Sequence, residues 1–300
     1  LLGFTFFGPL IGEAIGLIIL TILRLNIFKH LNLTQNYNNY KSIFKYSIPA
    51  FIGGLAVLSF TNAPYIILTL VKDLAITGIF TPAMLLATPL FIFPNAFTTA
   101  AFPIISGLSA KLRNGNSEKS LIEITFRYAV LLTLPLAAFL ISLSDQILLI
   151  LFKSEYLPAS KLLPILTIGA LLYGFGSIFI SFIYALKKPK ILQNILILMS
   201  VSFIILSIPL TLYFSAVGMS VAYLISTLIL FLLSYYNVRK LVKISLPYHD
   251  ILKILVATLL IVGFIFLGKV FIPRLISILL IIPSIVLYFV SLVYLRFYNK

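Results

Sequence analysis

The sequence predicts an all-α fold, a polytopic membrane helix bundle with about nine transmembrane helices. Of the 300 residues, 61% are apolar and 10% are charged, and the mean hydropathy is +1.17. A water-soluble domain needs a more polar surface than this composition can supply. Apolar runs of roughly 20 residues recur along the whole chain, and each is long enough to cross a hydrocarbon core of about 30 Å as a helix. The runs are continuously apolar, which excludes the alternating pattern of a membrane β-barrel.

Hydropathy windows of about 19 residues place the predicted spans one after another along the chain. The third span is unusually long and contains four prolines. Because an interior proline removes a backbone hydrogen bond and clashes with the preceding turn, this helix is expected to be kinked. In chain order the spans cover residues 8–23, 46–71, 75–108, 121–143, 162–185, 192–212, 217–235, 252–267 and 275–294.

The basic residues predict how the bundle is oriented. The net charge is +15, and most of the 22 Lys and Arg residues lie in the loops after the first, third, fifth, seventh and ninth spans. Cytoplasmic loops carry such an excess, so we expect a cell-membrane protein with its first residues outside and its C-terminus in the cytoplasm. Anionic lipid headgroups are the expected partners of these loops. The basic residues form no groove interleaved with aromatic side chains, so no nucleic-acid partner is expected.

Two similar segments indicate an internal repeat. Residues 7–18 and 213–224 both run from an aromatic residue through a short turn to a glycine, Gly12 or Gly218, followed by small residues at helical spacing. Six helices separate equivalent points of the two segments. This spacing is typical of a parallel repeat of two six-helix halves.

The repeat predicts three parts. The chain begins without Met, so it is expected to continue a longer protein whose first half is largely absent. The parts are residues 1–45, the last helix of a first bundle with a cytoplasmic linker; residues 46–240, a complete second six-helix bundle; and residues 241–300, two additional transmembrane helices.

Short motifs recur in a fixed order from the second span onward. Tyr46-Ser47-Ile48-Pro49 opens that span as Y-S-[LI]-P, residues 66–80 read as "ilg…GiY", 100–106 as "a…fP.iS", 151–159 as "lfg.eY..a" and 185–190 as "alg.pk". In this order and spacing they resemble the polysaccharide-flippase branch of the multidrug/oligosaccharidyl-lipid/polysaccharide (MOP) exporter superfamily. The resemblance covers about residues 46–240 and extends more weakly toward the N-terminus.

That resemblance implies a transporter that flips lipid-linked oligosaccharide or polysaccharide precursors by alternating access between two six-helix bundles. It implies a lipid-linked glycan as substrate, and other membrane proteins of glycan assembly as partners. Two alternatives stay open: an ion-coupled multidrug exporter of the same fold, and a membrane-embedded glycan polymerase or transferase. A lone second half could also be inactive, because it cannot form a cavity between two bundles.

The side-chain inventory argues against an enzyme. The chain has only seven acidic residues, two histidines and no cysteine. It shows no paired intramembrane carboxylates, no metal-ligand spacing and no Ser/His/Asp arrangement. We therefore expect no catalytic residues, no metal and no cofactor.

Two polar interruptions of apolar spans are candidate substrate-binding sites. Asn62, Pro64 and Tyr65 interrupt the second span, and Asn95 beside Pro94 interrupts the third. Broken helices expose backbone groups to the central cavity of transporters, where substrates bind. Interhelical hydrogen bonding with a simple kink is the alternative. Many members of the resembling branch carry an acidic residue where Pro64 and Tyr65 stand, so the role of that residue does not transfer to this chain.

Basic residues at the predicted cytoplasmic mouth are candidates for binding a substrate headgroup. Arginine contacts a phosphate in bidentate fashion and lysine acts as a point charge. A role limited to topology and anionic lipid is the alternative. The candidates are Lys111, Arg113, Arg127, Lys187 and Lys188, with Lys119 and Lys190 nearby.

Glu13 is the candidate ion-coupling residue, because it is the one acidic residue well inside an apolar run. Ionisable groups within the membrane are costly and are often functional, and burial would favour the neutral carboxyl group that proton coupling requires. Snorkelling to the interface, or a hydrogen bond to a neighbouring helix, is the alternative.

Overall fold

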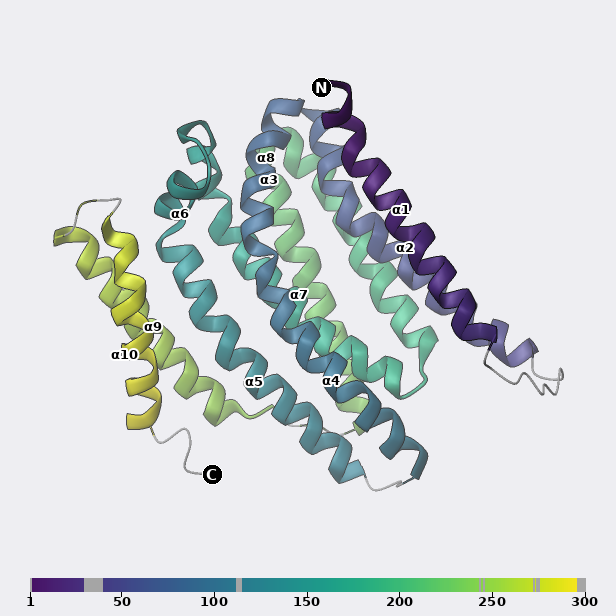
Figure 1. Ribbon diagram of the computed structural model, residues 1–300. Helices are drawn as coiled ribbons and strands as arrows, with labels where there is room; N and C mark the ends of the chain where they lie inside the picture. The colour runs from purple at the N-terminus through teal and green to yellow at the C-terminus, as the bar shows by residue number, and fades with distance from the viewer. Residues whose placement is uncertain are drawn as a thin grey trace. The chain divides into compact units, whose positions relative to one another are not determined.

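The computed structural model describes residues 2–29, 40–111, 115–242, 244, 246–271, 273 and 276–295. Over these residues the chain is helical, with short connections and no strand (Figure 1). It forms two compact units, Leu1–Lys45 and Tyr46–Lys300. The helices are α1 (Leu2–Lys29), α2 (Tyr40–Val71), α3 (Leu74–Ala87), α4 (Pro89–Lys111), α5 (Gly115–Ser142), α6 (Ser144–Leu151), η2 (Ser154–Lys161), α7 (Leu163–Ala185), α8 (Pro189–Val242), α9 (Tyr248–Phe271), η3 (Ile276–Leu280) and α10 (Ile281–Tyr294).

Length and composition confirm the predicted membrane bundle. Among the described residues, 7 helices are long and apolar enough to cross a membrane, and α1 adds a shorter apolar stretch, Ile11–Leu23. The count of nine spans stays a prediction. The lower count arises partly because the long α8 joins two predicted spans. The candidate spans are Ile43–Val71, Leu74–Ala101, Lys119–Ser142, Leu163–Ala185, Pro189–Val242, Tyr248–Phe271 and Ile276–Tyr294.

Helix α8 folds back on itself at Ser215. The backbone there is non-helical, with φ 55° and ψ −136°. On the near side of this turn α8 runs parallel to α2: Leu196 lies against Gly53, and the Ser200 hydroxyl donates to the Ala56 carbonyl at 2.6 Å. The contacting residues follow one another in the same order along both helices, as they do in a parallel pair.

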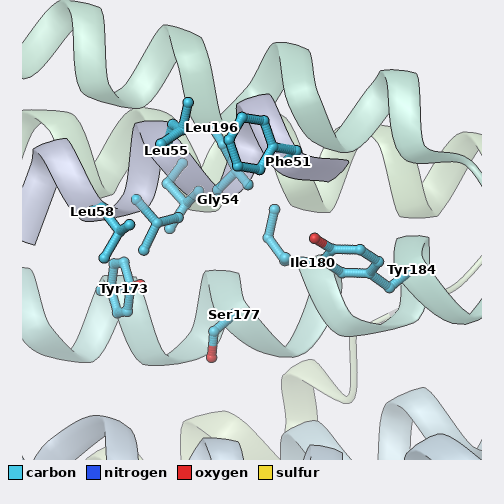
Figure 2. A pocket seen from close by; sticks show the side chains of 11 residues that line it. Phe51, Gly54, Leu55, Leu58, Tyr173, Ser177, Ile180, Tyr184 and Leu196 are labelled. Atoms are coloured by element: carbon cyan, nitrogen blue, oxygen red, sulfur yellow. The ribbon is translucent and has the colours of Figure 1, made fainter. Parts of the chain in front are cut away.

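Beyond the turn, α8 runs parallel to α7 instead. Tyr223 lies against Gly169 and Leu230 against Gly176. Because α7 runs opposite to α2 (Figure 2), the two halves of α8 are antiparallel. The predicted spans 192–212 and 217–235 are therefore separate passes, joined by the turn at Ser215.

The proline-rich third span is divided into two helices at Thr88, whose backbone angles stay helical, φ −54° and ψ −42°. Helix α3 ends there, and Pro89 begins α4, the helix position where a missing N–H costs least. The Thr88 N–H still donates to the Met84 and Leu85 carbonyls, so the two helices continue as one candidate span. Pro82 and Pro94 lie inside their helices without ending them.

Helix α9 packs along α5, and α10 packs on α9 (Figure 1). Pro135 of α5 has no N–H, which leaves the carbonyl of Leu131, four residues earlier, without its helical donor. The Tyr288 hydroxyl of α10 donates to this carbonyl at 2.7 Å. At one end of α9, Lys269 donates to the Ser142 carbonyl at the end of α5. These bonds fix the additional helices to α5 at two depths.

Replacing Tyr288 by phenylalanine is expected to lower the free energy of unfolding by about 1 kcal/mol, because the buried Leu131 carbonyl loses its donor. In a Pro135→Ala background, the alanine N–H can bond that carbonyl, and the same substitution should have little effect. Thermal unfolding of the wild type, both single variants and the double variant, purified in detergent, measures the difference. Equal losses from Tyr288→Phe in both backgrounds would contradict the assignment.

Candidate functional site

A cavity of about 460 Å³ opens between α2, α7 and α8. In Figure 2, Leu58 of α2 faces Tyr173 of α7 across this space. The lining is apolar except for one serine and two tyrosine hydroxyls, and it includes no charged side chain. The lining residues are Phe51, Gly54, Leu55, Val57, Leu58, Tyr173, Ser177, Ile180, Tyr184, Leu196 and Leu230.

The spacing of residues on α2 explains how the cavity forms. Phe51, Leu55 and Leu58 recur at helical intervals and so share one face of the helix. Gly54 lies between them, and no atom comes within 4 Å of the position that a Cβ would occupy there. The glycine therefore keeps part of the cavity open, and a larger residue would fill it.

An aromatic cluster fixes one side of the cavity. The Phe60 ring of α2 stacks on Tyr173 of α7 at 6.0 Å and on Tyr223 of α8 at 5.2 Å between ring centroids. Phe203 meets Phe60 edge to face at 5.1 Å. Such pairs stabilise by about 0.5–1.5 kcal/mol beyond their buried area. Tyr173 is thus held against α2 by Phe60, on which α8 packs in turn, while its ring still lines the cavity.

A polar pair joins α4 to α7 beside this cavity. The Ser177 hydroxyl shares its single proton between the Gly174 carbonyl at 2.7 Å and Asn95 Oδ1 at 3.2 Å. Close packing makes the pair possible: a Cβ on Gly174 would lie 3.0 Å from Pro94 Cγ. Among the candidates predicted from sequence in the two interrupted spans, Asn95 is the one that hydrogen-bonds a lining residue of the cavity, Ser177, although Asn95 does not itself line it.

In the second span the structure favours the alternative to a broken helix, and the role of its three candidate residues stays a prediction. Helix α2 continues through Asn62, Pro64 and Tyr65. The Asn62 amide donates to the Leu58 carbonyl of its own helix at 2.8 Å, which compensates locally for the polar side chain. Pro64 is buried, and the Tyr65 ring packs edge to face on Phe80 at 6.1 Å. None of the three predicted residues lines the cavity.

Arg127 lies in an ion pair inside the bundle. Its Nε is 3.5 Å from Asp250 Oδ2 on α9, and the Asp250 side chain is only 4% exposed. The structure therefore places this predicted headgroup residue between α5 and α9. Nearby, Lys119 Nζ lies 3.8 Å from Glu123 Oε1 on α5.

Lys187 and Lys188 lie exposed in the turn that joins α7 to α8. The Lys188 N–H donates to the Ile183 carbonyl and the Lys187 N–H to the Tyr184 carbonyl, which is the Schellman pattern of a helix end. Lys187 has φ 56°, a conformation that favours glycine. This is the position where the motif "alg.pk" has its glycine. Lys187 therefore adopts this conformation at a backbone cost of about 1 kcal/mol.

Three other candidates gain little from the structure. Glu13 is exposed on α1, within the first unit. Arg113 lies outside the described residues, and Lys111 ends α4 with a side chain that is also outside them. Within the described part of the chain, no cluster of three or more His, Cys, Asp or Glu residues could hold a metal ion.

Sequence reasoning missed Tyr173, Ser177 and Asp250. Tyr173 and Ser177 stand four residues apart in an apolar run rich in small residues, where neither is unusual. Asp250 could have been identified from the sequence, because it lies only two residues before the apolar run that begins at residue 252. An acidic residue so close to a span calls for a partner.

Comparison with known proteins identifies related chains. The family model described as "Lipid II flippase MurJ" matches residues 7–295. The chain is 26% identical over 231 residues to the probable low-salt glycan biosynthesis flippase Agl15 of Haloferax volcanii, which covers 77% of this chain and 49% of that protein. It thus spans about half the length of this curated relative.

Two solved structures share the fold. One is the lipid II flippase MurJ in an inward closed conformation, with a TM-score of 0.67, 21% identity, and coverage of 95% of this chain and 60% of that one. The other is an outward-facing multidrug resistance MATE family transporter of the MOP superfamily, with a TM-score of 0.57, 20% identity, and coverage of 77% and 54%. At these identities the likeness shows the fold alone.

Proposed function

Since the chain belongs to the family of the lipid II flippase MurJ, we propose that it acts as part of a flippase that moves a lipid-linked oligosaccharide or polysaccharide precursor across a cell membrane. The observation that carries this proposal is the uncharged cavity of about 460 Å³ among the spanning helices of the second unit. Its size suits one or two sugar rings, and its tyrosines offer both ring faces and hydroxyls.

In the proposed mechanism, this unit forms one of two bundles that open alternately to either side of the membrane. The basic loops face the cytoplasm, so the first residues are outside and the C-terminus is inside. Lys187 and Lys188, exposed at the α7–α8 turn, attract the anionic headgroup together with Lys111 and Arg113. The protein changes the position of its substrate and breaks no covalent bond. Glu13 couples transport to protons in this scheme, and anionic lipids and other glycan-assembly proteins are its neighbours.

The proposal can be tested by filling the cavity. The full-length protein is reconstituted in vesicles with a fluorescent polyprenyl-diphosphate disaccharide, and transfer between leaflets is followed by quenching from one side. Gly54→Leu is expected to slow transfer by about tenfold or more, equivalent to about 1.4 kcal/mol in the barrier. Gly263→Leu is the matched control, because no atom lies within 4 Å of its Cβ position either but it is on α9, outside the cavity.

Two results would contradict the proposal. Wild-type protein that leaves the fluorescent lipid in its original leaflet would rule out flipping of this substrate class. Equal rates in Gly54→Leu and Gly263→Leu would show that the cavity takes no part. An ion-coupled exporter of cationic drugs predicts an acidic side chain in the cavity, and none lines it. Accumulation of ethidium in the same vesicles would nevertheless favour that alternative.

A further inference from the structure

We propose that Asn95 and Ser177 form a neutral hydrogen-bonding site that recognises the sugar part of the substrate. This inference rests on the proposed function and assigns its specificity to two residues at the contact between α4 and α7, of which Ser177 also lines the cavity. The site would take uncharged hydroxyl or acetamido groups, whereas the diphosphate is left to the basic ends of the helices.

The hydrogen bonds leave the Asn95 amide ready to donate. Its Oδ1 accepts from the Ser177 hydroxyl, and its backbone carbonyl accepts from the hydroxyls of Thr98 and Thr99 at 2.9 and 2.8 Å. No described residue accepts a hydrogen bond from its Nδ2. Asn95 is also exposed within a candidate span, so two N–H donors are presented at the surface of the unit.

The surrounding packing fixes the position of these donors. Helices α4 and α7 run side by side in the same direction, since Phe91 meets Tyr173 edge to face at 5.7 Å and Asn95 meets Ser177 one turn further along both helices. Gly174 permits this approach, because its Cβ position is only 3.4 Å from the Leu90 carbonyl. That carbonyl has no helical donor because Pro94 lacks an N–H. The amide therefore projects from a rigid contact and not from a loose loop.

The chemical groups around Asn95 and Ser177 indicate the kind of ligand that would bind there. An amide donor exposed to hydrocarbon costs several kcal/mol, so a polar group at this depth is expected to face water or substrate. The adjoining cavity contains no cation that would bind phosphate. It does contain the ring of Tyr173, which combines an apolar face with a hydroxyl. A donor amide, a serine hydroxyl and an aromatic ring together suit a sugar.

The test measures preference for sugar and not transport alone. Full-length protein in vesicles flips a fluorescent polyprenyl-diphosphate disaccharide, while unlabelled competitor is either the same lipid or sugar-free polyprenyl diphosphate. The preference is the ratio of the two half-inhibitory concentrations. Asn95→Leu is expected to reduce this ratio by about tenfold, which corresponds to about 1.4 kcal/mol. Ser177→Ala, which removes the hydroxyl that orients the amide, should reduce it by a smaller factor.

Asn237→Leu is the matched control, because the Asn237 amide donates to the Leu233 carbonyl of its own helix at 2.8 Å. It should keep the wild-type ratio. If Asn95 and Ser177 only tie α4 to α7, both variants would lower thermal stability without changing the ratio, and the inference would fail. Should wild-type protein flip neither lipid, the proposed function itself fails and the inference falls with it. If the Asn95→Leu protein does not fold, the Ser177→Ala variant serves as the test. A wild-type ratio in Ser177→Ala would then overturn the inference.

Discussion

Gly218→Ala is expected to prevent α8 from folding back and to lower the free energy of unfolding by about 3 kcal/mol or more, the upper end of what overpacking usually costs. A Cβ at this position would collide with the carbonyl oxygen of Leu210, on the other side of the turn at Ser215. A flexible side chain could move aside, but a backbone carbonyl at the end of a helix cannot. Gly218 is also buried, so solvent offers no space for the displaced chain.

The measurement is the thermal midpoint and the monodisperse yield of purified protein in detergent. Gly263→Ala is the control substitution, because a Cβ there meets no atom within 4 Å and alanine favours the helical conformation. It should be neutral or slightly stabilising. Equal midpoints for Gly218→Ala and the wild type would mean that the two halves of α8 do not approach each other as the structure places them.

Hydropathy predicted most of the fold because the bilayer limits the options to helices of a fixed length. The predicted span 162–185 nearly coincides with α7. The predicted span 121–143 begins inside α5 and ends one residue beyond the end of that helix. The predicted break between 212 and 217 contains the non-helical Ser215. In each case a run of apolar residues ends where the chain leaves the hydrocarbon core of the membrane. Hydropathy therefore predicts the ends of these helices.

Of the two interpretations that the polar residues of the second span left open, the structure favours the continuous helix. Asn62 and Pro64 lie in a continuous helix, since an amide can bond the carbonyl four residues earlier and packed neighbours tolerate one proline. Sequence does not distinguish this arrangement from a broken helix, because both contain the same residues. Asn95 shows the converse: its partner Ser177 comes from another helix, and such a pairing depends on how α4 and α7 pack.

Asp250→Leu is expected to lower the free energy of unfolding by about 3 kcal/mol, because it leaves the Arg127 guanidinium without its carboxylate partner between α5 and α9. Asp250 Oδ2 lies 3.5 Å from Arg127 Nε, and the two side chains are 4% and 22% exposed. Removing one member of a buried pair costs far more than replacing both, since the remaining charge stays desolvated. The Arg127→Leu/Asp250→Leu double variant should therefore recover much of the loss.

Thermal unfolding of the four proteins in detergent measures this cycle, and Glu155→Leu is the matched control. Glu155 is exposed on η2, so its replacement should change the free energy of unfolding by no more than about 0.5 kcal/mol. If Arg127 served only to capture a substrate headgroup, Asp250→Leu would leave stability unchanged and alter transport alone. A large loss that the double variant reverses would instead show that this arginine joins α9 to the bundle. The headgroup would then depend on the exposed lysines at the α7–α8 turn.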